Sequence, residues 1–191
     1  MSVHRLSSVV AAMTLAVACG GLSGPVEIPA DDVPFPLTRV DPVPDVTSTV
    51  GRILVFFVLD GRLSAVTRTA DAGDTPTEAS MRALLGGPNP RETGRGLTTN
   101  LPVSTRLLDI IVGSNRVAIA DLSAEFQAPA DPDAITLRIA QVVWTLTQLP
   151  GVEEVRFAVD GSEISVATDD GHSVDRPVSR ADYDRFAPSP G

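Results

Sequence analysis

The chain offers few side chains that could carry out acid–base or nucleophilic chemistry. His172 is one of only two histidines, and the polar stretch 169–172 around it is typical of a solvent-exposed turn. A serine triad needs a histidine held beside a serine and oriented by a carboxylate. Ser165 and Ser173 can be paired with His172 only without regard to geometry. We therefore expect no catalytic residues and no enzyme activity.

Metal and phosphate sites are equally poorly supported. Four side chains near the C-terminus could contact a cation: Asp169, Asp170, His172 and Asp175. Their spacing does not match a calcium loop, which places ligands at alternate positions and ends with a glutamate. Gly86-Gly87 is followed by Pro88-Asn89-Pro90, whereas a phosphate-binding loop requires Lys and Ser or Thr there. We interpret these stretches as a charged loop and a helix stop, and expect no metal and no cofactor.

Composition narrows the class of partner. The 191 residues have a formal net charge of −9, which repels phosphate backbones and argues against nucleic-acid binding. Hydrophobic residues make up 43% of the chain, which is ordinary for a globular domain. The single cysteine, Cys19, excludes an internal disulfide and a cysteine-based zinc cluster.

The N-terminal residues 1–18 have the features of a secretion signal: Arg5, an apolar run, and small residues before Cys19. The segment 15–19, LAVAC, resembles a bacterial lipobox, which implies that a lipid is attached to Cys19 and holds the protein at the extracytoplasmic face of the cell membrane. Ala16 departs from the large aliphatic residue that the lipobox favours. The alternative is a plain signal peptide with a chance cysteine.

Three further segments follow. Residues 19–50 contain scattered prolines among acidic and small residues, which predicts an extended linker between the lipid and the domain. Residues 51–186 carry the periodic apolar pattern of one folded domain. Residues 187–191 are expected to form a disordered tail.

The stretch 131–149 predicts the main helix. Its apolar residues share one stripe of an α-helix: Ile135, Ile139, Val142, Leu146 and Leu149. Asp131 and Pro132 are typical of a helix start, and Pro150-Gly151 of a helix end. Arg138, Gln141 and Gln148 lie off the stripe.

Three residues of this helix are candidates for contact with a partner: Trp144, Arg138 and Gln141. Trp144 lies at the edge of the apolar stripe. A half-buried core position is the simpler interpretation of a tryptophan there, although this residue type is also enriched where proteins bind each other.

The remaining elements read as hairpins and one shorter helix. Asp60-Gly61, Ser114-Asn115 and Asp160-Gly161 each separate two apolar runs, as in tight β-hairpins. Thr75 and Glu78 form a capping box at the start of the shorter helix. The segment 96–102 is expected at a sheet edge. The pattern predicts an α+β fold, in which an antiparallel or mixed sheet of hairpins carries two helices packed on one face.

Several phrases resemble the GerMN domain, a sporulation and spore-germination module of extracytoplasmic bacterial lipoproteins. They are FFVLDGRLSAVTRT, SMRALLGGP, GLTTNLP, VAIADLSAEF and AQVVWTLTQLPGVEEVRFAVDG. The resemblance spans about residues 52–183. It implies a compact, non-enzymatic α+β module for assembly or regulation at the cell envelope, and the related modules support an envelope channel or act with a sensor kinase. We expect one copy of the module here, so neither partner transfers.

Two function classes remain beside a cell-wall hydrolase, which the lack of catalytic groups places last. The first is a lipid-anchored module that binds an unknown envelope protein, or itself, through a sheet edge or a helix face. The second is a small-molecule or glycan-binding envelope lipoprotein with a cleft between helix and sheet. Aromatic residues make up only 4% of the chain, which disfavours a sugar-binding platform.

Overall fold

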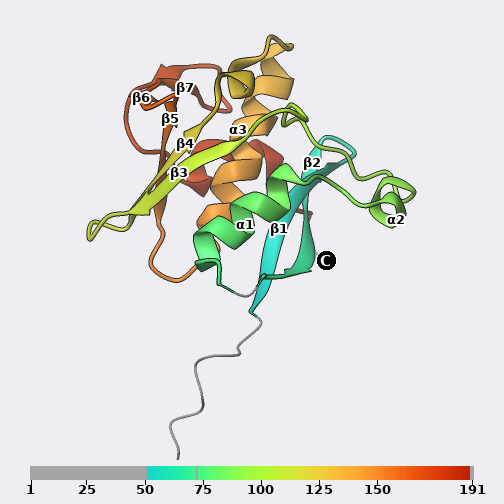
Figure 1. The fold of residues 1–191 in the computed structure, drawn as a ribbon. Coiled ribbons are helices and arrows are strands. Elements are labelled where there is room, and N and C mark those ends of the chain that lie inside the picture. Colours follow the sequence, from blue (N-terminus) through green and yellow to red (C-terminus); the bar gives the residue numbers. More distant parts are fainter. Residues whose placement is uncertain (1–50, 72, 190–191) are drawn as a thin grey trace, which may run out of the picture. The chain divides into compact units, whose positions relative to one another are not determined.

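The computed structural model describes residues 51–71 and 73–189, and Figure 1 shows how the chain begins there with a hairpin. Strand β1 (Arg52–Leu59) pairs antiparallel with β2 (Arg62–Thr69), as the predicted hairpin requires. The turn residues Asp60 and Gly61 have φ values of 50° and 76°. Asp and Gly tolerate this left-handed region, so the dipeptide closes the hairpin.

A four-stranded mixed sheet forms from chain segments on both sides of the main helix. Its order is β3-β4-β5-β6, with β3 at one edge. The strands are β3 (Leu107–Val112), β4 (Val117–Leu122), β5 (Glu154–Val159) and β6 (Ser162–Glu163). β4 and β5 run parallel, because a helix crosses over between them, and the other two pairs are antiparallel.

The two predicted helices begin where their capping residues indicate, and a third, short helix lies between them in the chain. They are α1 (Pro76–Leu85), α2 (Pro90–Thr93) and α3 (Pro132–Leu146), with 3-10 segments η3 (Ala124–Gln127) and η4 (Arg180–Phe186). Thr75 and Glu78 form the expected capping box, and the Ala134 N–H donates to Asp131 Oδ1 at 2.9 Å. Within the described residues, no helix has the length and apolar character needed to cross a membrane.

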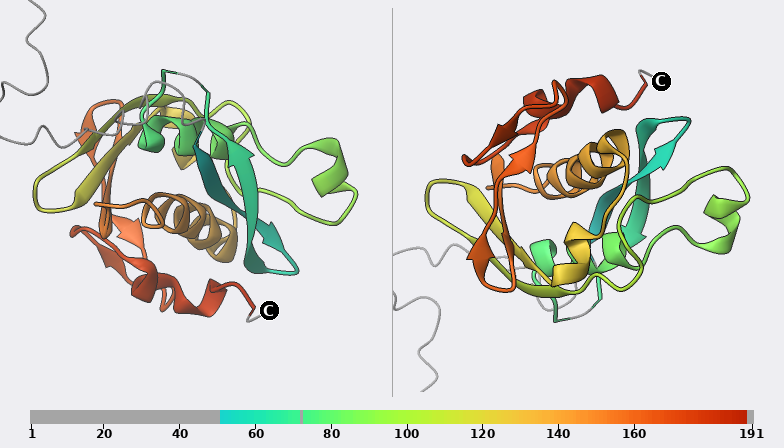
Figure 2. Two further views of the ribbon diagram at one scale, coloured as in Figure 1. Left: turned by 90° about the horizontal axis from the view of Figure 1, so that it is seen from below. Right: turned by 90° about the horizontal axis from the view of Figure 1, so that it is seen from above.

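Helix α3 lies between the β1–β2 hairpin and the four-stranded sheet, as both views of Figure 2 show. It also contacts α1 and η4. Most of its apolar stripe is buried as expected, while Ile135 is half-buried. Phe126 of η3 is buried beside it, and Tyr183 and Phe186 fix η4 to the core.

The α+β class with antiparallel and mixed sheets is confirmed, but a single sheet with both helices on one face is not observed. The strands form three sheets, the third of which pairs β7 (Val166–Ala167) with β8 (Ser173–Val174). The hairpin that Asp160-Gly161 predicts continues to Ile164, whose N–H donates to the Phe157 carbonyl at 3.0 Å, whereas Val166 and Ala167 pair with β8 instead of returning along β5. Helix α2 begins directly after the stretch interpreted as a helix stop and was not predicted.

Residues 1–50, 72, 190 and 191 lie outside the described residues. The predicted signal peptide, the lipidation site Cys19 and the linker 19–50 fall there, as does the end of the expected tail. These expectations remain predictions.

Candidate functional site

The free edge of β1 is covered by polar side chains of α3. The Phe56 N–H donates to Thr145 Oγ1 at 3.1 Å, and Gln141 Nε2 donates to the Phe56 carbonyl at 3.0 Å. Just beyond the helix, Gln148 Nε2 donates to the Leu54 carbonyl at 3.2 Å. An uncovered strand edge invites pairing with another chain. These side chains therefore prevent strand addition along this part of β1.

The segment 97–101 covers the next part of the same edge. Val58 and Thr98 exchange two backbone hydrogen bonds of 2.8 Å, which confirms the predicted edge segment. Two side chains of α3 hold it there, because Gln141 Oε1 accepts from the Asn100 N–H at 2.8 Å and Arg138 Nε donates to the Asn100 carbonyl at 3.0 Å. The segment is thus fixed between β1 and α3.

These contacts correct the placement of two candidate interaction residues. Arg138 is 5% exposed and Gln141 is 0% exposed, so neither lies on a helix face open to a partner. They lie off the apolar stripe, as the sequence indicates. They are nevertheless buried, because α3 lies between two sheets and its polar stripe faces an edge strand.

Trp144 is half-buried, as the simpler interpretation predicts. Its ring packs against Phe56, with centroids 5.5 Å apart, and the Arg180 guanidinium lies 4.6 Å from the ring centroid. Its Nε1 is buried and has no hydrogen-bond partner among the described residues. The residue thus joins β1, α3 and η4 instead of presenting its ring to solvent.

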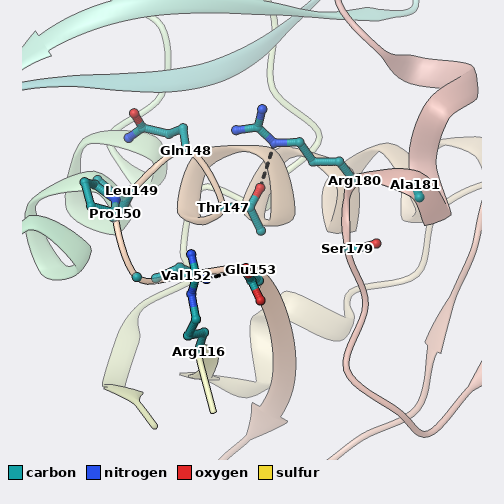
Figure 3. Close-up of a pocket in the computed structure, with 11 residues that line it drawn as sticks. Arg116, Thr147, Gln148, Leu149, Pro150, Val152, Glu153, Ser179, Arg180 and Ala181 are labelled. Carbon is teal, nitrogen blue, oxygen red and sulfur yellow. Dashed lines mark hydrogen bonds and ion pairs between the residues drawn. The ribbon is translucent and has the colours of Figure 1, made fainter. Parts of the chain in front are cut away.

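An open hollow of about 490 Å³ lies where the end of α3 meets η4. Figure 3 shows two pairs of its polar side chains bonded to each other. Arg180 Nε donates to Thr147 Oγ1 at 2.8 Å, and Arg116 pairs with Glu153 at 2.6 Å. Burial lowers the pKa of Arg180. We interpret this hollow as a joint between α3 and the C-terminal segment.

The stretch around His172 forms an exposed turn. The His172 side chain is 80% exposed, and its Nδ1 lies 3.1 Å from Asp170 Oδ2. Among the described residues no hydrogen bond joins His172 to Ser165 or Ser173, so the arrangement of a serine triad is not present there. Hydrogen bonds from the Thr168 hydroxyl and the His172 N–H lower the pKa of Asp170 to about 2.

The same stretch contains the four candidate cation ligands Asp169, Asp170, His172 and Asp175. Across residues 51–71 and 73–189, no group of three or more His, Cys, Asp or Glu side chains is arranged to hold a metal ion. The oxygen atoms of Asp170 serve the turn itself, because they accept from Thr168 and His172. The neighbouring carboxylate, that of Asp169, accepts a hydrogen bond from the Arg185 N–H at 2.9 Å and helps to hold η4.

The β3–β4 hairpin differs from the rest of the surface by exposing large aliphatic side chains. Four of the six such residues among the described ones lie on it: Leu108 (47%), Ile111 (57%), Val112 (40%) and Ile119 (36%). We call these four residues the β3 patch. Ile111 and Ile119 are directly opposite each other across the strand pair, so they share the face turned away from the core.

The outer backbone edge of β3 lies open beside the β3 patch. Gly113 donates to Val117 of β4, so the odd-numbered residues of β3 face β4 and the even-numbered ones face outward. The Ile110 N–H is bonded by the neighbouring Asp109 carboxylate at 2.8 Å. Within the described residues no other hydrogen bond reaches the outward groups of Ile110 and Val112. The outward carbonyls of Ile110 and Val112 and the Val112 N–H therefore have no partner among the described residues, and α1 also contacts β3.

Sequence reasoning identified β3 as a hairpin strand but not as an exposed one. An apolar run such as LLDIIV is equally typical of a strand buried on both faces. The one available signal is Asp109 within the run, since a charge on an edge strand is a common device against unwanted pairing.

Comparisons with known proteins agree with this fold. Residues 54–165 match the family model "Germane: Sporulation and spore germination". The spore germination protein GerM of Bacillus subtilis is 27% identical over 137 residues, which cover 71% of this chain and 37% of that protein. The chain thus spans well under half the length of this relative.

Solved structures resemble the chain at low sequence identity. The tandem GerMN domains of B. subtilis GerM match with a TM-score of 0.56 and 23% identity over 69% of this chain and 47% of theirs. The first GerMN domain alone matches with a TM-score of 0.51 and 21% identity, over 69% of this chain and 98% of that domain. A predicted lipoprotein of Clostridium perfringens matches with a TM-score of 0.50 and 17% identity, over 74% of this chain and 97% of that protein chain. Because the family model covers more than half of the residues, the chain belongs to the GerMN (Germane) family of sporulation and spore germination domains.

Proposed function

We propose that the chain is a non-enzymatic interaction module, held at the extracytoplasmic face of the membrane through Cys19, that binds another envelope protein along β3. The observation that carries the proposal is the open edge of β3 beside the β3 patch. Strand addition uses backbone hydrogen bonds for affinity and alternate side chains for specificity. Both are available here, because Ile110 and Val112 present backbone groups and Ile111 presents an aliphatic side chain.

The chemistry of the surface favours one kind of occupant. Asp109 and Asp121 are opposite each other across the strand pair and share the face of Ile111 and Ile119. Like charges in that position repel, and a cation from a partner relieves the repulsion. The occupant is therefore an extended segment with alternate aliphatic residues and an Arg or Lys at one end. A second copy fits less well, since the chain has a net charge of −9.

Capture of the partner tests the proposal. The acylated protein is used to recover proteins from its own cell envelope, in parallel with Ile111→Asp and with Val103→Asp as the matched control. Val103 is 97% exposed and lies outside both strands of the hairpin. We expect Ile111→Asp to lower recovery of the partner at least tenfold and Val103→Asp to leave it unchanged.

Hydrogen exchange then locates the contact. With the recovered partner added, the amides of Ile110 and Val112 should exchange at least tenfold more slowly. Equal recovery by both variants, or protection elsewhere, would contradict binding along β3. A concentration-dependent dimer of the protein alone that Ile111→Asp abolishes would instead identify a second copy as the occupant.

The anchor is tested separately. The lipid is expected on Cys19, so Cys19→Ala should move the protein from the membrane fraction to the soluble fraction. A Cys19→Ala variant that stays in the membrane fraction would contradict the anchor while leaving the β3 surface untouched. The name of the B. subtilis relative, a spore germination protein, is consistent with an envelope role.

A further inference from the structure

Arg138 carries a buried charge that no carboxylate among the described residues neutralises. Its side chain is 5% exposed, and none of the ion pairs formed within residues 51–71 and 73–189 includes it. Burial lowers its pKa, yet an arginine remains protonated in proteins. A buried cation without a counterion is costly unless other groups compensate it.

Part of this compensation comes from backbone carbonyls. Arg138 Nε donates to Asn100, and Nη1 donates to Phe126 and Ala128. These three bonds fasten two chain segments to α3, the one around Asn100 and η3 with its C-cap Ala128. Nη2 makes no hydrogen bond to any described residue, so its two N–H groups are free to bind something else.

A small cavity lies against the same side chain. It measures about 200 Å³, is lined by Arg138, and lies between η3, the first half of α3 and the segment that joins β6 to β7. Its deeper walls are the buried side chains of Phe126, Ile139 and Val166, and Ile164 and Ser165 lie nearer the opening. The cavity therefore combines an apolar interior with one cation.

Elsewhere in the domain a guanidinium of this kind has a carboxylate partner. Arg68 is 20% exposed at its side chain and binds both oxygens of Glu92 through Nη1 and Nη2. Such paired hydrogen bonds are the preferred way to satisfy arginine. The comparison shows what Arg138 lacks: a carboxylate that approaches from the cavity side.

We propose that this cavity binds a carboxylate carried on a short apolar chain. The carboxylate accepts from Arg138 Nη2, and the chain lies against Ile139, Ile164 and Val166. A cavity of 150 Å³ holds a benzene molecule, so this one holds about six to eight non-hydrogen atoms. The inference does not rest on binding along β3, because the two surfaces share no residue.

The carboxylate could belong to a free aliphatic acid or to the C-terminal residue of a peptide. Hexanoate represents the first source. The peptide acetyl-Ala-Ala-Leu with a free carboxyl group represents the second, and its C-terminal amide is the control. Either carboxylate binding at the cavity supports the proposal, and the relative affinities of the two identify the source.

The experiment is an NMR titration of the full-length chain that follows the Arg138 Nε–Hε signal. We expect hexanoate to bind at least tenfold more tightly than hexanol. Butanoate should bind about 15-fold more weakly than hexanoate, since each buried methylene contributes about fourfold. Equal binding of hexanoate and hexanol, or no dependence on chain length, would overturn the proposal, as would the absence of any shift for all probes.

Variants that spare the arginine complete the test, because Arg138→Met removes three carbonyl contacts and could prevent folding. Ser165→Trp places a large ring at the opening and leaves Arg138 in place. We expect this variant to bind hexanoate at least tenfold more weakly. The control is Ser162→Trp, on the exposed strand β6 outside the cavity lining, which should leave hexanoate affinity unchanged. Unweakened binding by Ser165→Trp would place the ligand elsewhere and overturn the inference.

Discussion

The two edge strands β1 and β3 differ in how the rest of the domain bonds their outward backbone groups. The outward groups of Phe56 on β1 are bonded by Thr145 and Gln141 of α3. Among the described residues, the only hydrogen bond to the outward groups of β3 is the one from the Ile110 N–H to the neighbouring Asp109 carboxylate. The edge of β1 is covered by buried polar side chains of α3. The edge of β3 is left open beside exposed aliphatic side chains.

This difference explains two residue patterns that look misplaced on their own. A buried polar side chain on a core helix is costly unless it is hydrogen-bonded, and Gln141 and Thr145 of α3 are bonded to β1. An exposed aliphatic patch has no such internal partner. We infer that the polar residues of α3 stabilise the fold, whereas the aliphatic residues of β3 are available for binding.

The largest effect is expected for Gln141→Leu. The change leaves the Phe56 carbonyl and the Asn100 N–H without their partner, and a buried polar group left unbonded costs about 1–3 kcal/mol. We expect the free energy of unfolding in urea to fall by about 3 kcal/mol. Gln148→Leu, which removes one exposed hydrogen bond, should lower it by less than about 1 kcal/mol. Equal effects would show that α3 does not close β1.

Thr145→Val tests the same contact between α3 and β1 with a smaller change in the side chain. Valine keeps the shape of threonine and removes the oxygen that accepts from Phe56. We expect a loss of about 1–2 kcal/mol, measured by the same urea titration. An unchanged stability would mean that the Phe56 N–H finds another partner.

On β3, Ile111→Ala should change the free energy of unfolding by less than about 0.5 kcal/mol, as is usual for an exposed position. Ile111 is 57% exposed, so little apolar surface returns to water when its side chain is shortened. A loss above about 2 kcal/mol would mean that the β3 patch is packed within the domain, and the contrast with β1 would fail.

The smallest effect concerns the exposed turn at Asp170, where hydrogen bonds act without burial. Thr168→Val removes the hydroxyl that contributes most to the low pKa of Asp170, so this pKa should rise from about 2 toward 3.8. Because the folded pKa lies below the ordinary value, the stability linked to this group is present above pH 3.8 and is lost as the pH falls toward 2. An NMR pH titration of the Asp170 carboxyl measures the shift.

Local signals predicted the parts of the fold that depend on neighbouring residues. Asp60-Gly61 marked the first hairpin, Thr75 and Glu78 the first helix, and Asp131 the start of α3. Asn89 and Glu92 make a second capping box that begins α2, so the sequence contained a helix signal directly after the predicted helix stop.

The features that were missed depend on contacts between distant segments. A hairpin signal shows which strands are adjacent but not that β4 pairs in parallel with β5. The helical stripe located the apolar face of α3 but gave no sign that Gln141 would meet Phe56, 85 residues away. For the same reason the sequence predicted neither the exposed edge of β3 nor the burial of Arg138 without a carboxylate partner among the described residues.

The hydrogen bond from Phe56 to Thr145 joins residues 89 positions apart. The first hairpin therefore cannot acquire its final contacts until most of the polypeptide has been synthesised. Domains dominated by such long-range contacts fold slowly. The edge of β1 is therefore closed only after α3 has been synthesised and has packed against it.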